Sequence, residues 1–397
     1  MLAALLASGV LLVSLAVVMG RVQEQVRVIG DDAAPRAATA SELYFALSDL
    51  DAQVARLVLV GGEDAFAGSE IDALAAYRER GEQIDAGLQR AAAGEDRQSA
   101  LRLVHQLAVY RQWVWQALTV ETAEDALGYY TQATNTLHLE LLPSARALRD
   151  AGEERLTDAY AAKQRTEIAG ISIAVLLGGT LLVLLIRLQL FLTRRFRRLC
   201  NPALIAATAL TAGLVVATVA VLVVQGQRLG AARDASLTPY LALSQARALS
   251  YDAAADTGRY LLDTGLGHYR EEFDRKAEEL TRGGSSLAEL SGSAEVAARW
   301  QGYQKVHERV VALADDGKRT EAIATLTGIR RGDAAFDFYA FDTAVSAVAD
   351  ERQRDFAEEL RRAEGLLAGW VAIPAGALAV VLLLVPLGVR RRLAEFR

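Results

Sequence analysis

Residues 203–225 read ALIAATALTAGLVVATVAVLVVQ, and none of their side chains carries a charge. A helix of about 20 apolar residues crosses the hydrocarbon core of a bilayer, and a helix satisfies its own backbone hydrogen bonds there. Asn201 and Pro202 directly precede the stretch and favour the start of a helix at this point. The stretch therefore predicts a membrane-spanning helix.

Three more stretches, residues 2–20, 169–186 and 367–389, have a similar length and also lack charged side chains. The chain is 52% hydrophobic, yet 23% of its residues are charged, so lipid-soluble and water-soluble segments alternate. This pattern excludes a simple soluble globular protein and a disordered chain. Because the first stretch lacks a basic leading segment and a small-residue cleavage site, we expect a retained anchor rather than a removed signal peptide.

Basic side chains in short loops predict the orientation, since Lys and Arg are enriched on the cytoplasmic side. Residues 190–202, between the second and third spans, contain four arginines in close succession, and residues 390–392 after the fourth span are all arginine. We therefore expect these segments and both termini in the cytoplasm, and residues 21–168 and 226–366 outside the cell. The two outer segments have net charges of −9 and −5, which argues against a nucleic-acid partner.

The chain consists of two similar halves. The sequence YFALS at 44–48 resembles YLALS at 240–244, and YRE occurs at both 77–79 and 269–271. The order of span, outer segment and span also occurs twice. These matches predict a duplicated module.

The outer segments have the apolar periodicity of helices. Apolar residues recur every three or four positions from Leu43 to Val58. The same spacing places a second set on one helix face: Leu101, Val104, Leu107, Ala108 and Trp115. No stretch has the alternating pattern of a strand. We expect each outer segment to form a helical bundle whose first and last helices continue from the flanking spans. The linker from Gly30 to Pro35 predicts an interruption of this continuity.

The predicted fold is thus all-α, with four transmembrane helices and two tandem extracytoplasmic helical bundles. The predicted segments are spans at 2–20, 169–189, 203–225 and 367–389, bundles at 21–168 and 226–366, a basic cytoplasmic loop at 190–202 and a basic cytoplasmic tail at 390–397.

Two spans around a helical bundle resemble the four-helix-bundle sensory domains of bacterial chemoreceptors and sensor kinases. Residues 315–322, DDGKRTEA, are similar to the charged turn and Glu-Ala helix that precede the last helix of those domains. The layout of the whole chain resembles the actinobacterial GlnX membrane proteins. This resemblance implies a partnership with an extracellular amino-acid-binding lipoprotein and a cytoplasmic Ser/Thr kinase. It assigns no functional residue by position.

Reactive motifs of known enzyme classes are missing from the sequence. His307 and Glu308 begin a zinc-protease pattern, but Val311 stands where the second histidine belongs. The four uncharged stretches contain no ionisable residue of the kind that ion transporters need, although Arg187 borders the second one. Gly178, Gly179 and Thr180 lie inside the second span, and close helix packing explains these small residues better than a phosphate-binding loop does. We expect a non-enzymatic protein with neither a metal nor another cofactor.

Three groups of outer residues are candidates for contact with a ligand or a partner. Trp113 and Trp115 are suited to anchor a protein, although we expect at least one of them in the bundle core. Four arginines near the predicted distal turns are suited to hold a small carboxylate, the alternative being ordinary surface ion pairs: Arg56, Arg78, Arg259 and Arg270. The acidic turn with Glu63 and Asp64 is suited to dock a basic surface, or is simply solvated.

On the inner side, Arg194, Arg195, Arg197 and Arg198 are candidate contacts for a cytoplasmic protein. Their alternative role is to set the topology and contact anionic lipid. We predict a receptor in the bacterial cell membrane that relays an extracellular nutrient signal, such as an amino acid, through a solute-binding protein to a separate effector such as a Ser/Thr kinase. The alternative is a structural or accessory subunit of an envelope complex. A homodimer is compatible with either.

Overall fold

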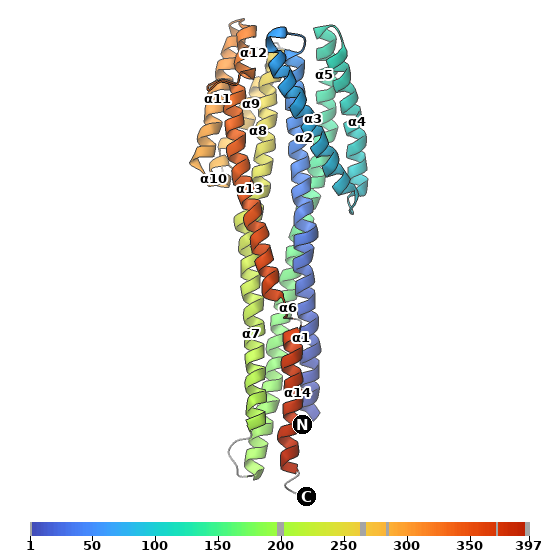
Figure 1. The fold of residues 1–397 in the computed structure, drawn as a ribbon, viewed down its shortest axis with the longest axis vertical. Helices are drawn as coiled ribbons and strands as arrows, with labels where there is room; N and C mark the ends of the chain where they lie inside the picture. Colours follow the sequence, from blue (N-terminus) through green and yellow to red (C-terminus); the bar gives the residue numbers. More distant parts are fainter. Residues whose placement is uncertain (1, 197–201, 263–266, 283–285, 371, 394–397) are drawn as a thin grey trace. The chain divides into compact units, whose positions relative to one another are not determined.

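The computed structural model describes residues 2–196, 202–262, 267–282, 286–370 and 372–393 (Figure 1). All regular elements in this part of the chain are helices, which confirms the predicted all-α class. Four helices are long and apolar enough to cross a membrane, as predicted. The chain divides into two compact units. The span unit is Met1–Ala33, Arg155–Asp234 and Asp355–Arg397, and the bundle unit is Ala34–Glu154 and Ala235–Arg354.

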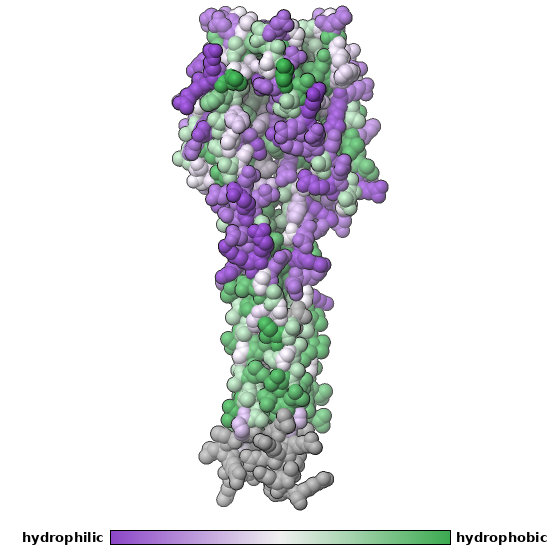
Figure 2. All heavy atoms as spheres, viewed as in Figure 1, coloured by the Kyte–Doolittle hydropathy of each residue, from purple (hydrophilic) through white to green (hydrophobic). Residues whose placement is uncertain are grey.

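The span unit contains four apolar helices: α1 (Leu2–Val28), the second part of α6 (Leu142–Phe196), α7 (Pro202–Ala232) and α14 (Ala372–Leu393). Their shared core contains Leu11 and Leu15 of α1 together with residues of the other three helices. Hydrophobic residues also gather over the outer surface of these helices (Figure 2). Gly178 of α6 lies so close to Val215 of α7 that a Cβ atom at this glycine would overlap the valine. The predicted close packing is therefore present at Gly178, whereas a Cβ atom at Gly179 would meet no atom within 4 Å.

The span unit also buries polar side chains on α1, α6 and α7. Lys163 Nζ lies 2.7 Å from Glu167 Oε1, and both side chains are almost fully buried. Gln25 Nε2 donates to Thr166 Oγ1 at 2.9 Å. Gln225 is fully buried, and neither polar atom of its side chain has a hydrogen-bond partner among the described residues.

Three helical connections lead from one unit to the other without a break. Helix α1 passes through the wide turn η1 (Ile29–Ala33) into α2 (Ala34–Val60), and α7 passes through η4 (Arg233–Leu237) into α8 (Thr238–Leu262). Helix α6 belongs to both units. The linker from Gly30 to Pro35 therefore widens the helix, with a π-type hydrogen-bond pattern, instead of interrupting it. The fourth connection is broken, since α13 (Ala334–Leu367) ends shortly before Gly369, whose φ is +85°.

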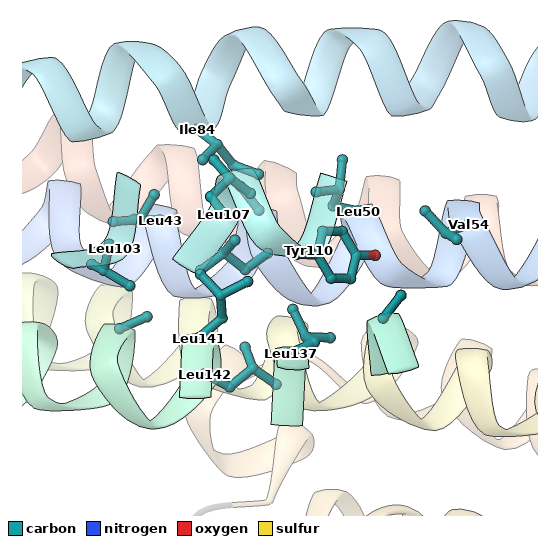
Figure 3. Packing of buried hydrophobic residues seen from close by; sticks show 14 of the residues in the cluster. Leu43, Leu50, Val54, Ile84, Leu103, Leu107, Tyr110, Leu137, Leu141 and Leu142 are labelled. Atoms are coloured by element: carbon teal, nitrogen blue, oxygen red, sulfur yellow. The ribbon is translucent and has the colours of Figure 1, made fainter. Parts of the chain in front are cut away.

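The first half of the bundle unit has an aliphatic core. Its helices are α2, the short η2 (Asp64–Phe66), α3 (Ala67–Ala92), α4 (Arg97–Thr119) and α5 (Ala123–Thr136), and the last of these continues through η3 (Leu137–Leu141) into α6. Their buried side chains point toward one another in Figure 3, with Tyr110 of α4 among the leucines. The leucines predicted on one face of α2 are in this core.

The second half of the bundle unit has an aromatic core. It contains α8, α9 (His268–Thr281), α10 (Leu287–Ser291), α11 (Ala294–Asp315), α12 (Arg319–Thr327) and most of α13. The rings of Phe273, Trp300, Tyr303 and Phe341 are fully buried, and Trp300 stacks on Tyr303 with 5.4 Å between ring centroids.

The two halves pack on each other through α2 and α8, which run side by side in Figure 1. Phe45 of α2 contacts Tyr251 of α8 edge-on, with 5.2 Å between ring centroids. A Cβ atom at Gly258 would lie 3.6 Å from Ala55 Cβ, so the backbones approach closely. Residues predicted to form two bundles thus fold into one compact unit.

Helix α4 presents a different face to the core than the one expected. Leu101, Val104 and Trp115 are exposed, by 54%, 45% and 67%. Ala108 is exposed as well, and Leu107 is the one member of the expected set that lies in the core. The buried stripe runs through Leu103, Leu107 and Tyr110, which also recur at helical spacing and meet the leucines of α2 and α3.

Candidate functional site

A buried group of charges lies between the two halves of the bundle unit. Its centre is Arg259 of α8, whose side chain is 2% exposed. The guanidinium pairs with Asp51 of α2 and with Asp256 one turn before it on α8. Arg259 Nη1 also lies 3.3 Å from Asp252 Oδ1. An arginine expected near a distal turn is therefore the ion-pair centre of the interface between the halves.

A second cation completes this group. Lys276 Nζ of α9 lies 2.7 Å from Asp252 Oδ2 and 2.6 Å from Asp256 Oδ2. We call Asp51, Asp252, Asp256, Arg259 and Lys276 the charge cluster. Tyrosine and histidine side chains from the first half surround it. Tyr110 donates to Asp51 Oδ1 at 3.1 Å, Arg259 Nε donates to the Tyr130 hydroxyl at 3.3 Å, and His138 Nε2 lies 3.2 Å from Arg259 Nη2.

Burial and charge act against each other on the carboxylates of the charge cluster. Burial raises the pKa of Asp256 above its ordinary value, although Arg259 and Lys276 oppose this change. Burial also acts to raise the pKa of Asp252, but Lys276 and Arg259 outweigh it and lower that pKa. Burial and Arg259 together lower the pKa of His138. The charge cluster thus sets three carboxyl groups against two basic side chains.

A cavity of about 560 Å³ opens beside the charge cluster. Its walls come from α2, α5, η3 and α6 of the first half and from α8, α9 and α10 of the second. Arg146, Glu272, Arg275 and Glu279 add charged side chains to the wall. A cavity with both signs of charge can take a polar solute.

A second cavity, of about 230 Å³, lies between α2, α3, α8, α11, α12 and α13. Arg56 of α2 is part of its wall, and so is Asp72 of α3. Burial lowers the pKa of Arg56, and Asp72 opposes this change only in part.

The structure separates the four arginines that the sequence grouped. The guanidinium of Arg259 forms ion pairs with three carboxylates, those of Asp51, Asp252 and Asp256. Arg270 makes an exposed ion pair with Asp315 at 3.5 Å, which is the surface role named as the alternative. Arg78 is exposed on α3 and lies outside the walls of both cavities. Arg56 alone of the four lines the smaller cavity.

The two tryptophans of α4 lie in different surroundings. Trp113 is half-buried, packs against the first-half core and stacks on Tyr129 with 6.2 Å between ring centroids. Trp115 is exposed on the same face as Leu101 and Val104. Glu63 and Asp64 are exposed at the end of α2, as expected for an acidic turn.

The predicted inner contacts lie at the edge of the described structure. Arg194 and Arg195 belong to the end of α6. Arg197 and Arg198 lie outside the described residues.

Sequence reasoning missed most of the charge cluster. Asp51, Asp252, Asp256 and Lys276 lie on three helices, and each resembles a surface charge when its helix is considered alone. A signal was available on α8, where Asp252, Asp256 and Arg259 recur at helical spacing on the face that also holds apolar residues. His307 also lies in the core, where it stacks on Phe273 with 3.4 Å between ring centroids. Among the described residues, no group of His, Cys, Asp and Glu is arranged to hold a metal ion.

Residues 25–161 match the model of a protein family described as the actinobacterial sensor domain. The matched segment contains α2 to α5 and the start of α6, which is the first half of the bundle unit with the charge-cluster residue Asp51. No curated protein and no solved structure matches the chain. The chain is thus similar, over residues 25–161, to a sensor domain, and this likeness supports a sensing role for a membrane protein with four candidate spans among the described residues.

Proposed function

We propose that this protein is a non-enzymatic receptor of the bacterial cell membrane. In this proposal the bundle unit lies outside the cell and responds to a nutrient such as an amino acid, presented by a solute-binding protein. Both termini and the arginine-rich loop lie inside, where a separate effector such as a Ser/Thr kinase receives the signal. The bilayer and these two proteins are the proposed partners.

The observation that carries the proposal is the continuity of the helices. Leu2–Val60 and Pro202–Leu262 are each helical throughout, and each joins an apolar span to the α2–α8 pair at the centre of the bundle unit. A helix transmits a small translation along its axis with little loss, and receptor switching uses translations of about 1–2 Å. The charge cluster fixes α2 to α8 and α9, so the two halves are held to move together.

The exposed side of α4 is the surface that we propose for the solute-binding protein. Leu101, Val104, Trp115 and Leu118 form an exposed apolar stripe on this helix. A tryptophan within an apolar patch is typical of the residues that contribute most to binding a protein.

Photo-cross-linking in the native membrane tests the proposal. A photoreactive amino acid at position 115 should trap a solute-binding protein, and one at position 194 should trap a kinase. The same amino acid at position 113 is the matched control, because Trp113 is packed against the core and should trap little. If neither position gives its cross-linked product in cells that make the protein well, the proposal that the protein relays a signal between these two partners is overturned.

The apolar stripe also fits the alternative role, a structural subunit of an envelope complex. The two roles differ in how the complex responds to nutrients. A receptor complex should change in amount or lifetime when the nutrient is added or withdrawn. If the complex trapped from position 115 is stoichiometric and its amount is the same with and without the nutrient, the structural role is favoured.

A further inference from the structure

The smaller cavity owes its existence to small residues on facing helices. Ala52 and Ala55 of α2 line it together with Ala254, Ala255 and Gly258 of α8. Alanines of α13 and aromatic side chains complete the apolar part of the wall: Ala334, Ala335, Tyr251, Tyr303, Phe338 and Tyr339. Tyr339 is 70% exposed, which places it at the rim.

Arg56 brings a charge into this apolar surrounding without a matching acceptor. Its Nε atom is buried and has no hydrogen-bond partner among the described residues. Its Nη2 atom lies 3.5 Å from the Thr327 carbonyl oxygen, the long limit of a hydrogen bond. Within the described structure no carboxylate comes within ion-pair distance of Arg56, and Asp72 acts on it only from farther away.

A buried, unpaired N–H is costly, by about 1–3 kcal/mol or more where the group is charged. Native proteins keep such a group where something else satisfies it. Nε and Nη2 lie on one edge of the guanidinium, the edge that a carboxylate binds with two parallel hydrogen bonds. The rest of the wall offers methyl groups and ring faces to an apolar body.

We propose that the smaller cavity binds a small carboxylate with an apolar body, held by Arg56. The inference rests on the proposed function, since the ligand would be the nutrient to which the bundle unit responds. The volume of about 230 Å³ exceeds the cavity of about 150 Å³ that takes up benzene in another protein. A branched or aromatic carboxylate of similar size therefore fits.

Ligand-detected NMR on the full chain in nanodiscs tests the site. The probes are 4-methylpentanoate and benzoate, each paired with its neutral amide, and L-leucine as a carboxylate with an added ammonium group. We expect the carboxylates to bind and the amides to bind at least about tenfold more weakly, because a charge-assisted bidentate bond is lost. Equal binding of acids and amides, or binding of neither, would overturn the proposal, with water then satisfying Arg56.

Three variants locate the site. Arg56→Gln should weaken carboxylate binding roughly 10–100-fold, and Arg78→Gln, an exposed arginine on the neighbouring helix, should leave it unchanged. If Arg56→Gln does not fold, Ala335→Leu fills the cavity without changing a charge and should abolish binding. Unchanged affinity in both cavity variants would contradict the assignment.

Asp72 distinguishes the two kinds of carboxylate. Tighter binding of L-leucine than of 4-methylpentanoate, lost in Asp72→Asn, would assign the ligand to the α-amino acids. Tighter binding of 4-methylpentanoate would assign it to simple carboxylic acids. These measurements need no output from the cell, so the site can fail while the relay stands, and the relay can fail while the site stands.

Discussion

At the scale of the residue, Arg259 is the side chain on which the interface between the two halves depends most. Its removal leaves Asp51 and Asp256 buried beside one remaining cation, Lys276. Breaking a buried pair by removing one partner costs about 3–5 kcal/mol. We therefore expect Arg259→Met to destabilise the bundle unit by about that amount, measured by denaturant unfolding of the full chain in detergent.

Arg270→Met is the matched control for this substitution. Its ion pair with Asp315 is exposed, and such pairs contribute below about 1 kcal/mol. Equal effects of the two substitutions would show that the charge cluster does not hold the halves together.

His307 makes the stability depend on pH. Burial, with a smaller effect of Arg270, lowers its pKa to about 3 in the folded chain, against 6.5 for an ordinary histidine. Below pH 6.5 the unfolded chain therefore binds a proton that the folded chain does not, and stability falls as the pH falls. At pH 5 the loss is about 2 kcal/mol.

The variant His307→Gln cannot take up this proton. We expect its free energy of unfolding to change about 2 kcal/mol less than that of the unaltered chain between pH 7 and pH 5. His138 also has a lowered pKa, so a smaller pH dependence of the same sign should remain. An unchanged pH dependence in His307→Gln would contradict the buried, neutral histidine.

At the scale of the element, Gly178 makes one of the close contacts of α6 with α7 in the span unit. A side chain at Gly178 would overlap Val215, whereas one at the neighbouring Gly179 meets no atom within 4 Å. Overpacking of this kind costs about 1–3 kcal/mol. Gly178→Val should lower the thermal unfolding temperature in detergent, and Gly179→Val should not.

Because both substitutions place the same residue on the same helix, they share its effect on helix propensity. The difference between the two unfolding temperatures therefore reports the contact with α7 alone. Equal unfolding temperatures would mean that the two helices are not packed at this position.

At the scale of the whole molecule, the sequence predicted those features that depend on the residues of one helix alone. The spans were found because lipid permits only long apolar helices, and the face of α2 was found because its leucines recur at helical spacing. The face of α4 was predicted wrongly, because Trp115 and Val104 extend an apolar pattern that Tyr110 and Leu103 also satisfy. Periodicity cannot choose between two such faces without the helices that cover one of them.

The pairing of α2 with α8 lies beyond such reasoning. Asp51 and Arg259 are separated by 208 positions and meet only in the folded unit. Arg56 was named among four candidate arginines, but the absence of an acceptor around its Nε atom depends on six helices together. Which side chain pairs with which depends on the tertiary structure. The sequence could therefore name candidate arginines, but it could not show which of them lacks a partner.

The most direct test of the receptor is whether a ligand in the bundle unit changes the spacing of the spans. In a Cys200→Ser background, spin labels on the exposed positions Val17 of α1 and Val380 of α14 report the distance between these helices in nanodiscs. The account predicts that the carboxylate that binds best shifts this distance by about 1–2 Å, and that Arg56→Gln abolishes the shift. An unchanged distance in a chain that binds the carboxylate would contradict the relay.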